Sequence, residues 1–247
     1  MKHDYPDRYS GLDSPLHRLD PRSKLFGFTA ALLIIVSEPR GELVPFLFYF
    51  ALIAALLLIS RVPVMFILRR CLNASPFILL AALLLPFSSL LSDREAGLTT
   101  EVWNFSLSVV LKALAAIILL VLLTSLDKFH RLLKGLRSTG FPAVFTVLAA
   151  LMYRYIFILN DERLRTQMAR LSRTPGRLRR GRFRVIGNQA AVIFLRSWER
   201  AHLVHQAMLA RGFDGSFPEY GKLVFVPMDI IFCCSLTFLF LLIRIGI

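Results

Sequence analysis

The chain has 247 residues, of which 56% are hydrophobic and 19% are charged, and its formal net charge is +14. Several uncharged apolar runs are long enough to enter a bilayer, which excludes an ordinary soluble domain and predicts an all-α polytopic membrane protein. The Lys and Arg residues cluster between these runs, where cytoplasmic loops and the anionic inner leaflet account for them. We therefore expect the lipid bilayer as a partner and no nucleic acid.

The first two dozen residues are polar and charged, with no early apolar core. This pattern predicts that there is no cleavable signal peptide and that the N-terminus is cytoplasmic. The three cysteines lie in or beside apolar segments without a CxxC pair. We interpret them as packing residues rather than as disulfide or metal-binding positions: Cys71, Cys233 and Cys234.

Residues 14–24 form a polar lead-in to the first apolar run. Pro15 and Pro21 disfavour helix in the residues before them, so we expect an ordered, cytoplasmic segment here. The first membrane span is predicted at residues 25–37, which is short for a bilayer. The second is predicted at residues 43–60, with a proline near its start, where proline is tolerated.

The next segment, residues 61–71, carries Arg61, Arg69 and Arg70. These arginines predict a cytoplasmic loop, and the apolar residues between them are enough for one interfacial helical turn. The third span is predicted at residues 72–92. Its two prolines bend a helix unless neighbouring groups satisfy the freed carbonyls.

Lys112 lies inside the fourth predicted span, residues 102–126. A lysine that faces lipid near the bilayer centre is unfavourable, so we expect its side chain to face protein or to snorkel outward. A role on a substrate path is the less favoured alternative.

Residues 127–222 combine amphipathic segments with dense arginine. They predict a cytoplasmic domain between residues 1–126, which hold the lead-in and four spans, and residues 223–247, which hold the last span. The domain begins with an amphipathic helix over residues 128–137 that lies along the inner membrane surface, closed by Gly140 and Pro142.

Residues 141–160 are apolar enough to cross the membrane. A crossing here would place the arginine-rich remainder of the domain outside, against the positive-inside rule. We therefore expect a helix that is buried or lies along the membrane, and whether it spans stays open. The helix is predicted to continue to residue 173 and to end at Thr174-Pro175-Gly176.

A second long helix is predicted from about residue 185 to residue 211. Spacings of three and four residues give it one apolar face, which we expect to pack against the preceding helix. His202 and His205 lie one turn apart, but no third metal ligand recurs at a useful spacing, so we interpret both as surface or packing residues. The apolar face comprises Phe194, Trp198, Ala201, His205 and Met208.

The last span is predicted at residues 223–243, interrupted by Pro227 and Asp229. Asp229 lies close to the cytoplasmic end of this span, which favours an interfacial partner over a proton relay. With this assignment nearly all Lys and Arg residues lie inside. The asymmetry predicts a cytoplasmic N-terminus, five spans and an external C-terminus.

The second long helix has a charged start and a glycine stop. Good helix formers continue to Arg211, and Gly212 then occupies the position where a left-handed cap is cheapest. An arginine in the last turn projects past the final carbonyls and can form a fork with a partner's carboxylates. The alternative is a plain helix terminator, which is common in proteins.

The two long helices each end in an Ala-Arg-x motif, Ala169-Arg170-Leu171 and Ala210-Arg211-Gly212. With the other matching segments, these motifs resemble the transmembrane T component of energy-coupling factor (ECF) transporters, in particular its cobalt and nickel branch, the CbiQ family. The resemblance covers nearly the whole chain. Its further segments are Leu16-His17-Arg18-Leu19-Asp20-Pro21-Arg22-Ser23-Lys24-Leu25, Met152-Tyr153-Arg154-Tyr155 and Gln206-Ala207-Met208-Leu209, followed by Phe213-Asp214-Gly215.

The resemblance implies a multi-pass protein of the cell inner membrane that couples ATP hydrolysis to import of cobalt or nickel. The two motifs would dock into grooves on two ATP-binding cassette subunits. A CbiM-like membrane S component would hold the substrate, with a small accessory membrane subunit as a further possible partner. Leu171 departs from the small third residue usual in the first motif. The implied docking residues are Ala169, Arg170, Leu171, Ala210, Arg211 and Gly212.

The residues themselves agree with a partner-driven role. No GxxxxGK[ST] phosphate loop occurs, so the chain is not expected to be a P-loop ATPase, and no ligand cluster for cobalt or nickel is seen. We expect neither an enzyme nor a bound cofactor. The alternatives are a T component for a vitamin, a membrane scaffold without transport, and a membrane enzyme built on Lys112, His130 or Asp229, for which no convergent pair of titratable groups exists.

Overall fold

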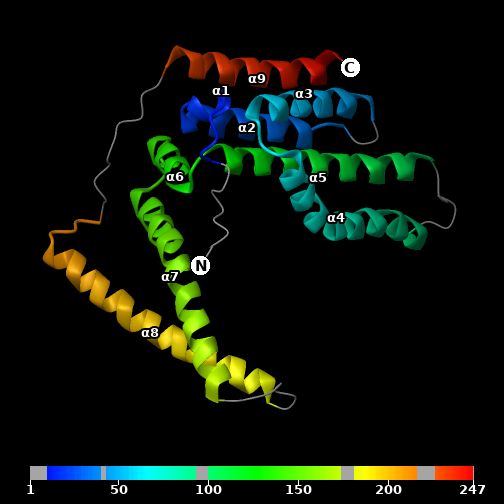
Figure 1. The fold of residues 1–247 in the computed structure, drawn as a ribbon. Helices are drawn as coiled ribbons and strands as arrows, with labels where there is room; N and C mark the ends of the chain where they lie inside the picture. The colour runs from blue at the N-terminus through cyan, green and yellow to red at the C-terminus, as the bar shows by residue number, and fades with distance from the viewer. Residues whose placement is uncertain (1–9, 40–42, 93–99, 174–180, 216–225, 247) are drawn as a thin grey trace. The chain divides into compact units, whose positions relative to one another are not determined.

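The computed structural model describes residues 10–39, 43–92, 100–173, 181–215 and 226–246 (Figure 1). All regular elements of these residues are helices. The chain divides into two compact units, residues 4–139 with 223–247 and residues 140–222 with 1–3. We call the first the membrane unit and the second the α7–α8 unit.

The membrane unit holds seven of the described helices, and the α7–α8 unit holds two long ones. In the membrane unit these are α1 (Pro15–Arg18), α2 (Pro21–Val36), α3 (Val44–Ser60), α4 (Val64–Ser92), α5 (Thr100–Leu126), α6 (Phe129–Ser138) and α9 (Pro227–Gly246). The other unit consists of α7 (Ala143–Arg173) and α8 (Arg182–Ala210).

Prolines mark several helix starts. Pro15, Pro21 and Pro227 are each the first helical residue of α1, α2 and α9. The sequence predicted that Pro227 interrupts the last span, but the helix begins there, because proline at the first position loses no hydrogen bond and has its φ preset for helix. Asp20 strengthens the start of α2, since its carboxylate accepts a hydrogen bond from the Arg22 N–H at 2.9 Å.

The predicted loop at residues 61–71 is wrong in extent. Arg61 adopts a left-handed conformation with φ 55°, and α4 begins three residues later at Val64 and runs through Arg69 and Arg70. No helix breaker follows Val64 until Pro76, so the predicted interfacial turn continues into the third span. The Arg70 guanidinium lies 5.1 Å from the centre of the Phe66 ring one turn earlier, which accommodates its charge on the helix.

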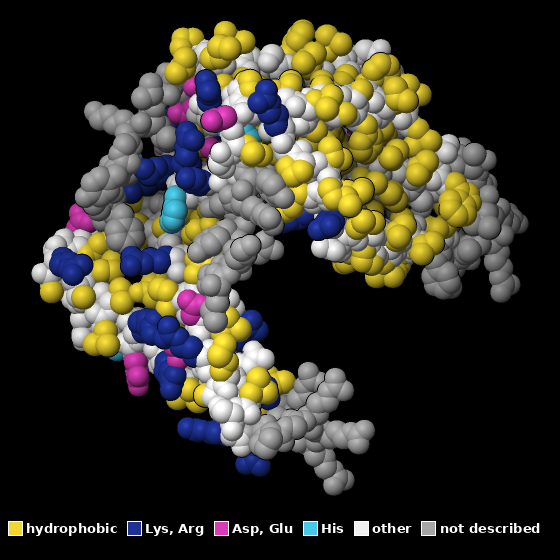
Figure 2. Space-filling view, viewed as in Figure 1, with side chains coloured by type: hydrophobic (Ala, Val, Ile, Leu, Met, Phe, Trp, Pro, Cys, Tyr) yellow, Lys and Arg dark blue, Asp and Glu magenta, His cyan; other side chains and the backbone are white. Residues whose placement is uncertain are grey.

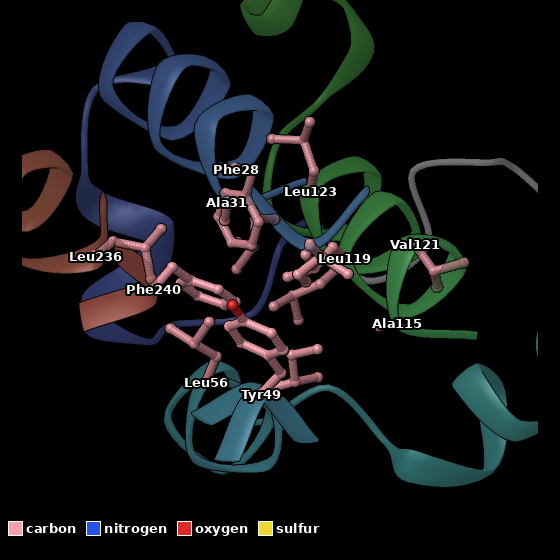
Figure 3. Close-up of a cluster of buried hydrophobic side chains, with 14 of the residues drawn as sticks. Phe28, Ala31, Tyr49, Leu56, Ala115, Leu119, Val121, Leu123, Leu236 and Phe240 are labelled. Atoms are coloured by element: carbon pink, nitrogen blue, oxygen red, sulfur yellow. The ribbon is translucent and has the colours of Figure 1, made fainter. Parts of the chain in front are cut away.

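The core of the membrane unit lies where α2, α3, α5 and α9 meet (Figure 3). Helices α2 and α3 pack against both α9 and α5, and α4 packs on the outside of α5. The Tyr49 ring stacks on Phe240 with ring centroids 5.6 Å apart. Helices α2 and α9 approach closely at Gly27, where an added Cβ would lie 3.2 Å from the Leu236 side chain.

Length and composition allow four helices of the described chain to cross a membrane: Val64–Leu84 of α4, Val102–Leu126 of α5, Ala143–Arg173 and Pro227–Gly246. Helix α3 is apolar but shorter. Large hydrophobic side chains are exposed over the membrane unit (Figure 2), as lipid-facing surfaces require. The all-α polytopic fold class is therefore confirmed.

The helix predicted at residues 141–160 continues to Arg173 as predicted and forms the single helix α7 of the α7–α8 unit. Of the predicted apolar face of α8, Ala201, His205 and Met208 line a cavity of about 370 Å³ shared with α7. Phe194 and Trp198 do not, since they are 65% and 63% exposed. The face of α8 that meets α7 changes along the helix, as expected for helices that cross, and the fixed spacing missed this change.

Candidate functional site

The end of α8 has the predicted cap. Gly212 has φ 78°, in the left-handed region, and an added Cβ there would meet nothing within 4 Å. Its N–H donates to the Leu209 carbonyl at 2.9 Å, and the Phe213 N–H donates to the Met208 carbonyl at 3.0 Å. This pair of bonds is a Schellman motif. The prediction of a left-handed cap at Gly212 is confirmed, and backbone conformation alone requires the glycine.

The cap leaves Arg211 at the tip. Helix α8 ends at Ala210, and both Ala210 and Arg211 are exposed. Met208 and Phe213, the two residues joined by the outer bond of the cap, both line the apolar cavity between α7 and α8. Packing of Met208 and Phe213 thus fixes the end of α8, while the Arg211 side chain stays exposed.

The first motif is placed differently. Ala169 and Leu171 are exposed on the last turns of α7, and the helix continues to Arg173. The predicted breakers at residues 174–176 lie outside the described residues. Because the helix does not stop at Leu171, the first motif has no cap of its own, and a large third residue meets no backbone restriction there.

Arg170 lies in a cleft rather than at a tip. It lines a cavity of about 720 Å³ between α7 and α8. Its Nε is buried and has no hydrogen-bond partner among the described residues. Arg165, Arg173 and Arg196 also line this cavity, and a single carboxylate, Glu162, joins them. The cleft is therefore strongly cationic, and a carboxylate or carbonyl from outside would satisfy the orphaned donor.

Two polar contacts join the helices beside this cleft. Arg196 of α8 forms an ion pair with Glu162 of α7. The Gln189 side chain donates to the Arg163 carbonyl at 3.5 Å. These contacts set the crossing of α7 and α8 next to Arg170.

The structure does not bring the two motifs together. The first lies near the start of α8 and the second at its end (Figure 1). A helix rises about 1.5 Å per residue, and the cleft that Arg170 lines is formed by residues 185–196 of α8, so roughly 30 Å of helix separates this cleft from Arg211. Each motif is available to a different partner surface.

A buried ion pair that sequence analysis missed lies in the membrane unit. The Lys24 Nζ is 2.6 Å from the Asp127 Oδ2, and the two side chains are 0% and 1% exposed. Lys24 also donates to the His17 carbonyl at 3.2 Å. Burial raises the pKa of Asp127, while the neighbouring Lys24 and Arg131 charges oppose that shift. The only sequence signal was a lysine directly before an apolar run and an aspartate directly after one.

Asp229 has two hydrogen-bond partners within the protein. Its carboxylate accepts the Asp20 N–H and the Val226 N–H, each at 2.8 Å. The second bond caps the start of α9 from inside the helix, as the acidic residue of a capping box does. The first bond ties α9 to the start of α2. The side chain is buried, so both oxygens act within the protein.

Lys112 faces protein, as predicted. Its ammonium donates to the Glu38 carbonyl at 2.7 Å, directly after α2 ends, where the helix dipole favours a cation. The Tyr49 hydroxyl donates to the Glu38 carboxylate at 2.8 Å. Because Asp229 binds at the opposite end of α2, the structure separates Lys112 from Asp229.

The histidines of α8 lie apart from any metal-binding group of the described residues. The His202 ring contacts Trp198 with centroids 6.2 Å apart, and His205 lines the apolar cavity. Among the residues that the structure describes, no group of three or more His, Cys, Asp or Glu side chains is suited to hold a metal ion.

Comparisons with known proteins give one family. The family model CbiQ, cobalt transport protein, matches residues 13–220. An uncharacterized protein of Methanocaldococcus jannaschii, MJ1571, is 20% identical over 92% of this chain and 80% of its own length. MJ1089 of the same organism is 28% identical over 42% of this chain and 41% of its own length.

A further relative is the putative fused cobalt transport protein CbiMQ of Methanocorpusculum labreanum. It is 27% identical over 49% of this chain, and the match covers 21% of that longer protein. The chain thus matches less than half of the length of two of the three relatives.

Proposed function

Because this chain belongs to the CbiQ family of cobalt transport proteins, we propose that it is the transmembrane coupling subunit of an ECF-type importer. In this role two ATP-binding cassette subunits dock on the chain through Arg170 and Arg211. Their ATP-driven motion reaches a separate membrane subunit that holds the substrate. The chain itself supplies neither the ATP site nor the ion site.

The observation that carries the proposal is the separation of two arginines on one pair of helices. Arg211 projects from a capped helix end, and Arg170 has a buried, unpaired Nε in a cationic cleft. Both suit carboxylate or carbonyl acceptors on a partner. Because roughly 30 Å of helix separates them, two partner copies suit the geometry better than one.

The relative from Methanocorpusculum labreanum supports the substrate side of the proposal. Its name describes a fused CbiMQ chain. Proteins joined in one chain are held at high effective concentration, which favours a direct contact between the two parts. We therefore place a CbiM-like S component beside this chain, with cobalt or nickel as the substrate and a small accessory membrane subunit as a further partner.

The test is recovery of ATP-binding subunits with the tagged chain, together with cobalt uptake. Arg170→Ala and Arg211→Ala each leave a partner group unpaired at the interface. Affinity for the ATP-binding subunits should fall about 30-fold or more per site. Arg→Lys at either position should be nearly as harmful where the contact is bidentate, since an ammonium cannot reproduce the fork.

A matched control comes from the same pair of helices. Arg184→Ala removes a charge from an exposed position at the start of α8, outside the lining of the cleft. It should leave recovery and uptake unchanged. Normal assembly and uptake in the Arg170→Ala, Arg211→Ala double variant would show that the arginines are surface residues. Assembly without cobalt or nickel uptake would favour a vitamin transporter or a scaffold.

A further inference from the structure

The start of α2 holds charges that stability alone does not explain. The side chains of Lys24 and Asp127 are removed from solvent and lie 2.6 Å apart. Transfer of two charges from water into a protein interior is so unfavourable that well-packed apolar residues of similar size often stabilise a fold equally well or better. We therefore look for a role of the ion pair in holding the two segments that carry Lys24 and Asp127 at a fixed position relative to each other.

Asp127 stands at the junction between α5 and α6. It directly follows Leu126, the last residue of α5, and Lys128 separates it from Phe129, the first residue of α6. Its Oδ1 is buried without a hydrogen bond, and the Arg131 guanidinium of α6 lies 3.5 Å from it, with the Arg131 side chain 48% exposed. A single carboxylate thus connects a cation of α2 with a cation of α6.

A second contact holds α6 against α2. At Gly135, in the middle of α6, an added Cβ would lie 3.2 Å from Leu25 and 3.3 Å from Pro21. An added Cβ would require Leu25 or Pro21 to shift by a few tenths of an ångström, so α6 and α2 lie in close contact here. Helix α6 then leads through Gly140, with φ 95°, into the α7–α8 unit.

Helix α9, which follows the α7–α8 unit in the sequence, also contacts the start of α2. The chain leaves this unit at residue 222, and α9 begins at Pro227. The Asp229 carboxylate in the first turn of α9 accepts the Asp20 N–H at 2.8 Å, directly before α2. Both flanks of the α7–α8 unit, α6 and α9, are therefore fastened to the first turn of α2.

We propose that the first turn of α2 is the anchor through which movement of α7 and α8 reaches the membrane helices, with Lys24 and Asp127 as positioning residues. This inference rests on the proposed coupling function. Fixed contacts of α6 and α9 with α2 would transmit a displacement of these helices to α2, whereas loose contacts would absorb it. Loss of the ion pair should therefore uncouple ATP hydrolysis from uptake while the docking arginines remain able to hold the ATP-binding subunits.

The main variant is the double substitution Lys24→Met with Asp127→Leu, which removes both charges and keeps similar volumes. The complete transporter is purified, reconstituted and assayed for recovery of the ATP-binding subunits, ATP hydrolysis and cobalt uptake. Recovery and hydrolysis should match the wild type. Uptake per ATP hydrolysed should fall about tenfold, within the usual range of coupling energies. An unchanged ratio of uptake to hydrolysis would overturn the proposal.

A second variant keeps the charges and changes only the packing. Gly135→Val pushes α6 away from Pro21 and Leu25, and Gly187→Val in α8, where an added Cβ meets nothing within 4 Å, is its matched control. Gly135→Val should lower uptake per ATP by a similar factor, and Gly187→Val should not. Equal ratios in both would refute the anchor even where the Lys24→Met, Asp127→Leu variant fails to fold.

The outcomes separate this inference from the proposed function. Failure of the wild-type chain to retain ATP-binding subunits contradicts the proposed function. Normal retention and normal coupling in Gly135→Val contradict only the anchor. The charge exchange Lys24→Asp with Asp127→Lys adds a specific readout, because it should restore coupling relative to Lys24→Asp alone if the pair acts by attraction.

Discussion

Two ion pairs between residues far apart in the sequence, one in each unit, have the same chemistry in different surroundings. Lys24 and Asp127 are fully enclosed, whereas Arg196 is 59% exposed and Glu162 14% exposed. Enclosed charges resist separation, because each would be left unpaired away from water. Exposed charges separate easily, because water and salt replace the partner. In the membrane unit, an enclosed ion pair thus holds the start of α2 to the end of α5. Within the α7–α8 unit, an exposed ion pair connects α7 to α8 and can break and re-form.

The largest expected effect is an all-or-none difference in cysteine labelling from the two sides of the membrane, which tests the topology of the two units. In a chain whose three cysteines are replaced, single cysteines at Ser138 and Ser172 should both react with an impermeant reagent only from the inner face. They flank α7, which is long and apolar enough to span. External labelling at Ser172 would show that α7 crosses and would overturn the topology. A cysteine at Gly246 should label only from outside.

Removal of one member of the enclosed ion pair should destabilise the membrane unit strongly. Asp127→Ala leaves the Lys24 ammonium buried without its carboxylate and should cost about 3 to 5 kcal/mol. Thermal unfolding in detergent measures this change. Glu162→Ala, the same substitution in the exposed pair, is the control and should leave the melting temperature almost unchanged. Equal effects of the two substitutions would remove the distinction between the units.

Aromatic residues sharpen the same comparison. Phe240 is fully buried and stacks on Tyr49, while Phe194 of α8 is exposed. Phe240→Ala should destabilise the membrane unit by about 3 kcal/mol through lost packing and a cavity. Phe194→Ala should not change the unfolding midpoint. A large effect at Phe194 would mean that this side chain is covered by protein that stabilises the fold.

The cap of α8 should give a smaller effect. Gly212→Val forces a β-branched residue to φ 78° and should destabilise the helix end by roughly 1 kcal/mol or more. Hydrogen exchange of residues 205–213 measures the local change. Gly187→Ala, inside α8 with open space around it, should be neutral or slightly stabilising. Unchanged exchange in Gly212→Val would contradict the Schellman cap.

The smallest effect is expected at the exposed pair itself. Arg196→Ala should increase hydrogen exchange slightly near residues 185–196 in dilute buffer. High salt should abolish the difference, since the screening length falls to about 3 Å at 1 M. The enclosed pair should show no such salt dependence. A salt-independent effect of Arg196→Ala would place its ion pair in a drier environment than its exposure indicates.

Local signals in the sequence predicted much of the fold. Apolar runs, prolines and glycines gave the helical class, the end of α8 and the left-handed conformation of Gly212, because these features depend on a few neighbouring residues. The arginine pattern does not predict the extension of α4 back to Val64, because the long side chains of Arg69 and Arg70 extend from a continuous helix without ending it.

Long-range partners were less accessible. The position of Lys112 predicted that its side chain faces protein or snorkels outward, but the Glu38 carbonyl as its acceptor follows only from the packing of α5 beside α2. The ion pair of Lys24 and Asp127 joins positions that no spacing rule connects. In α8, Phe194 and Trp198 share a face with Ala201 by periodicity, yet the crossing with α7 exposes them, and a single sequence holds no measure of that crossing.

The hydrogen bond between Asp20 and Asp229 joins residues 209 positions apart, which has a consequence for biogenesis. Helix α9 completes the membrane unit against α2 and α3, yet the whole α7–α8 unit must be synthesised before α9 leaves the ribosome. At roughly 5 to 20 residues per second this delay is on the order of ten seconds. During that time α9 does not yet cover the surfaces of α2 and α3 against which Phe240 and Leu236 later pack. Lipid or the insertion machinery would then have to cover these surfaces of α2 and α3, and the yield of folded protein would depend on how well they do so.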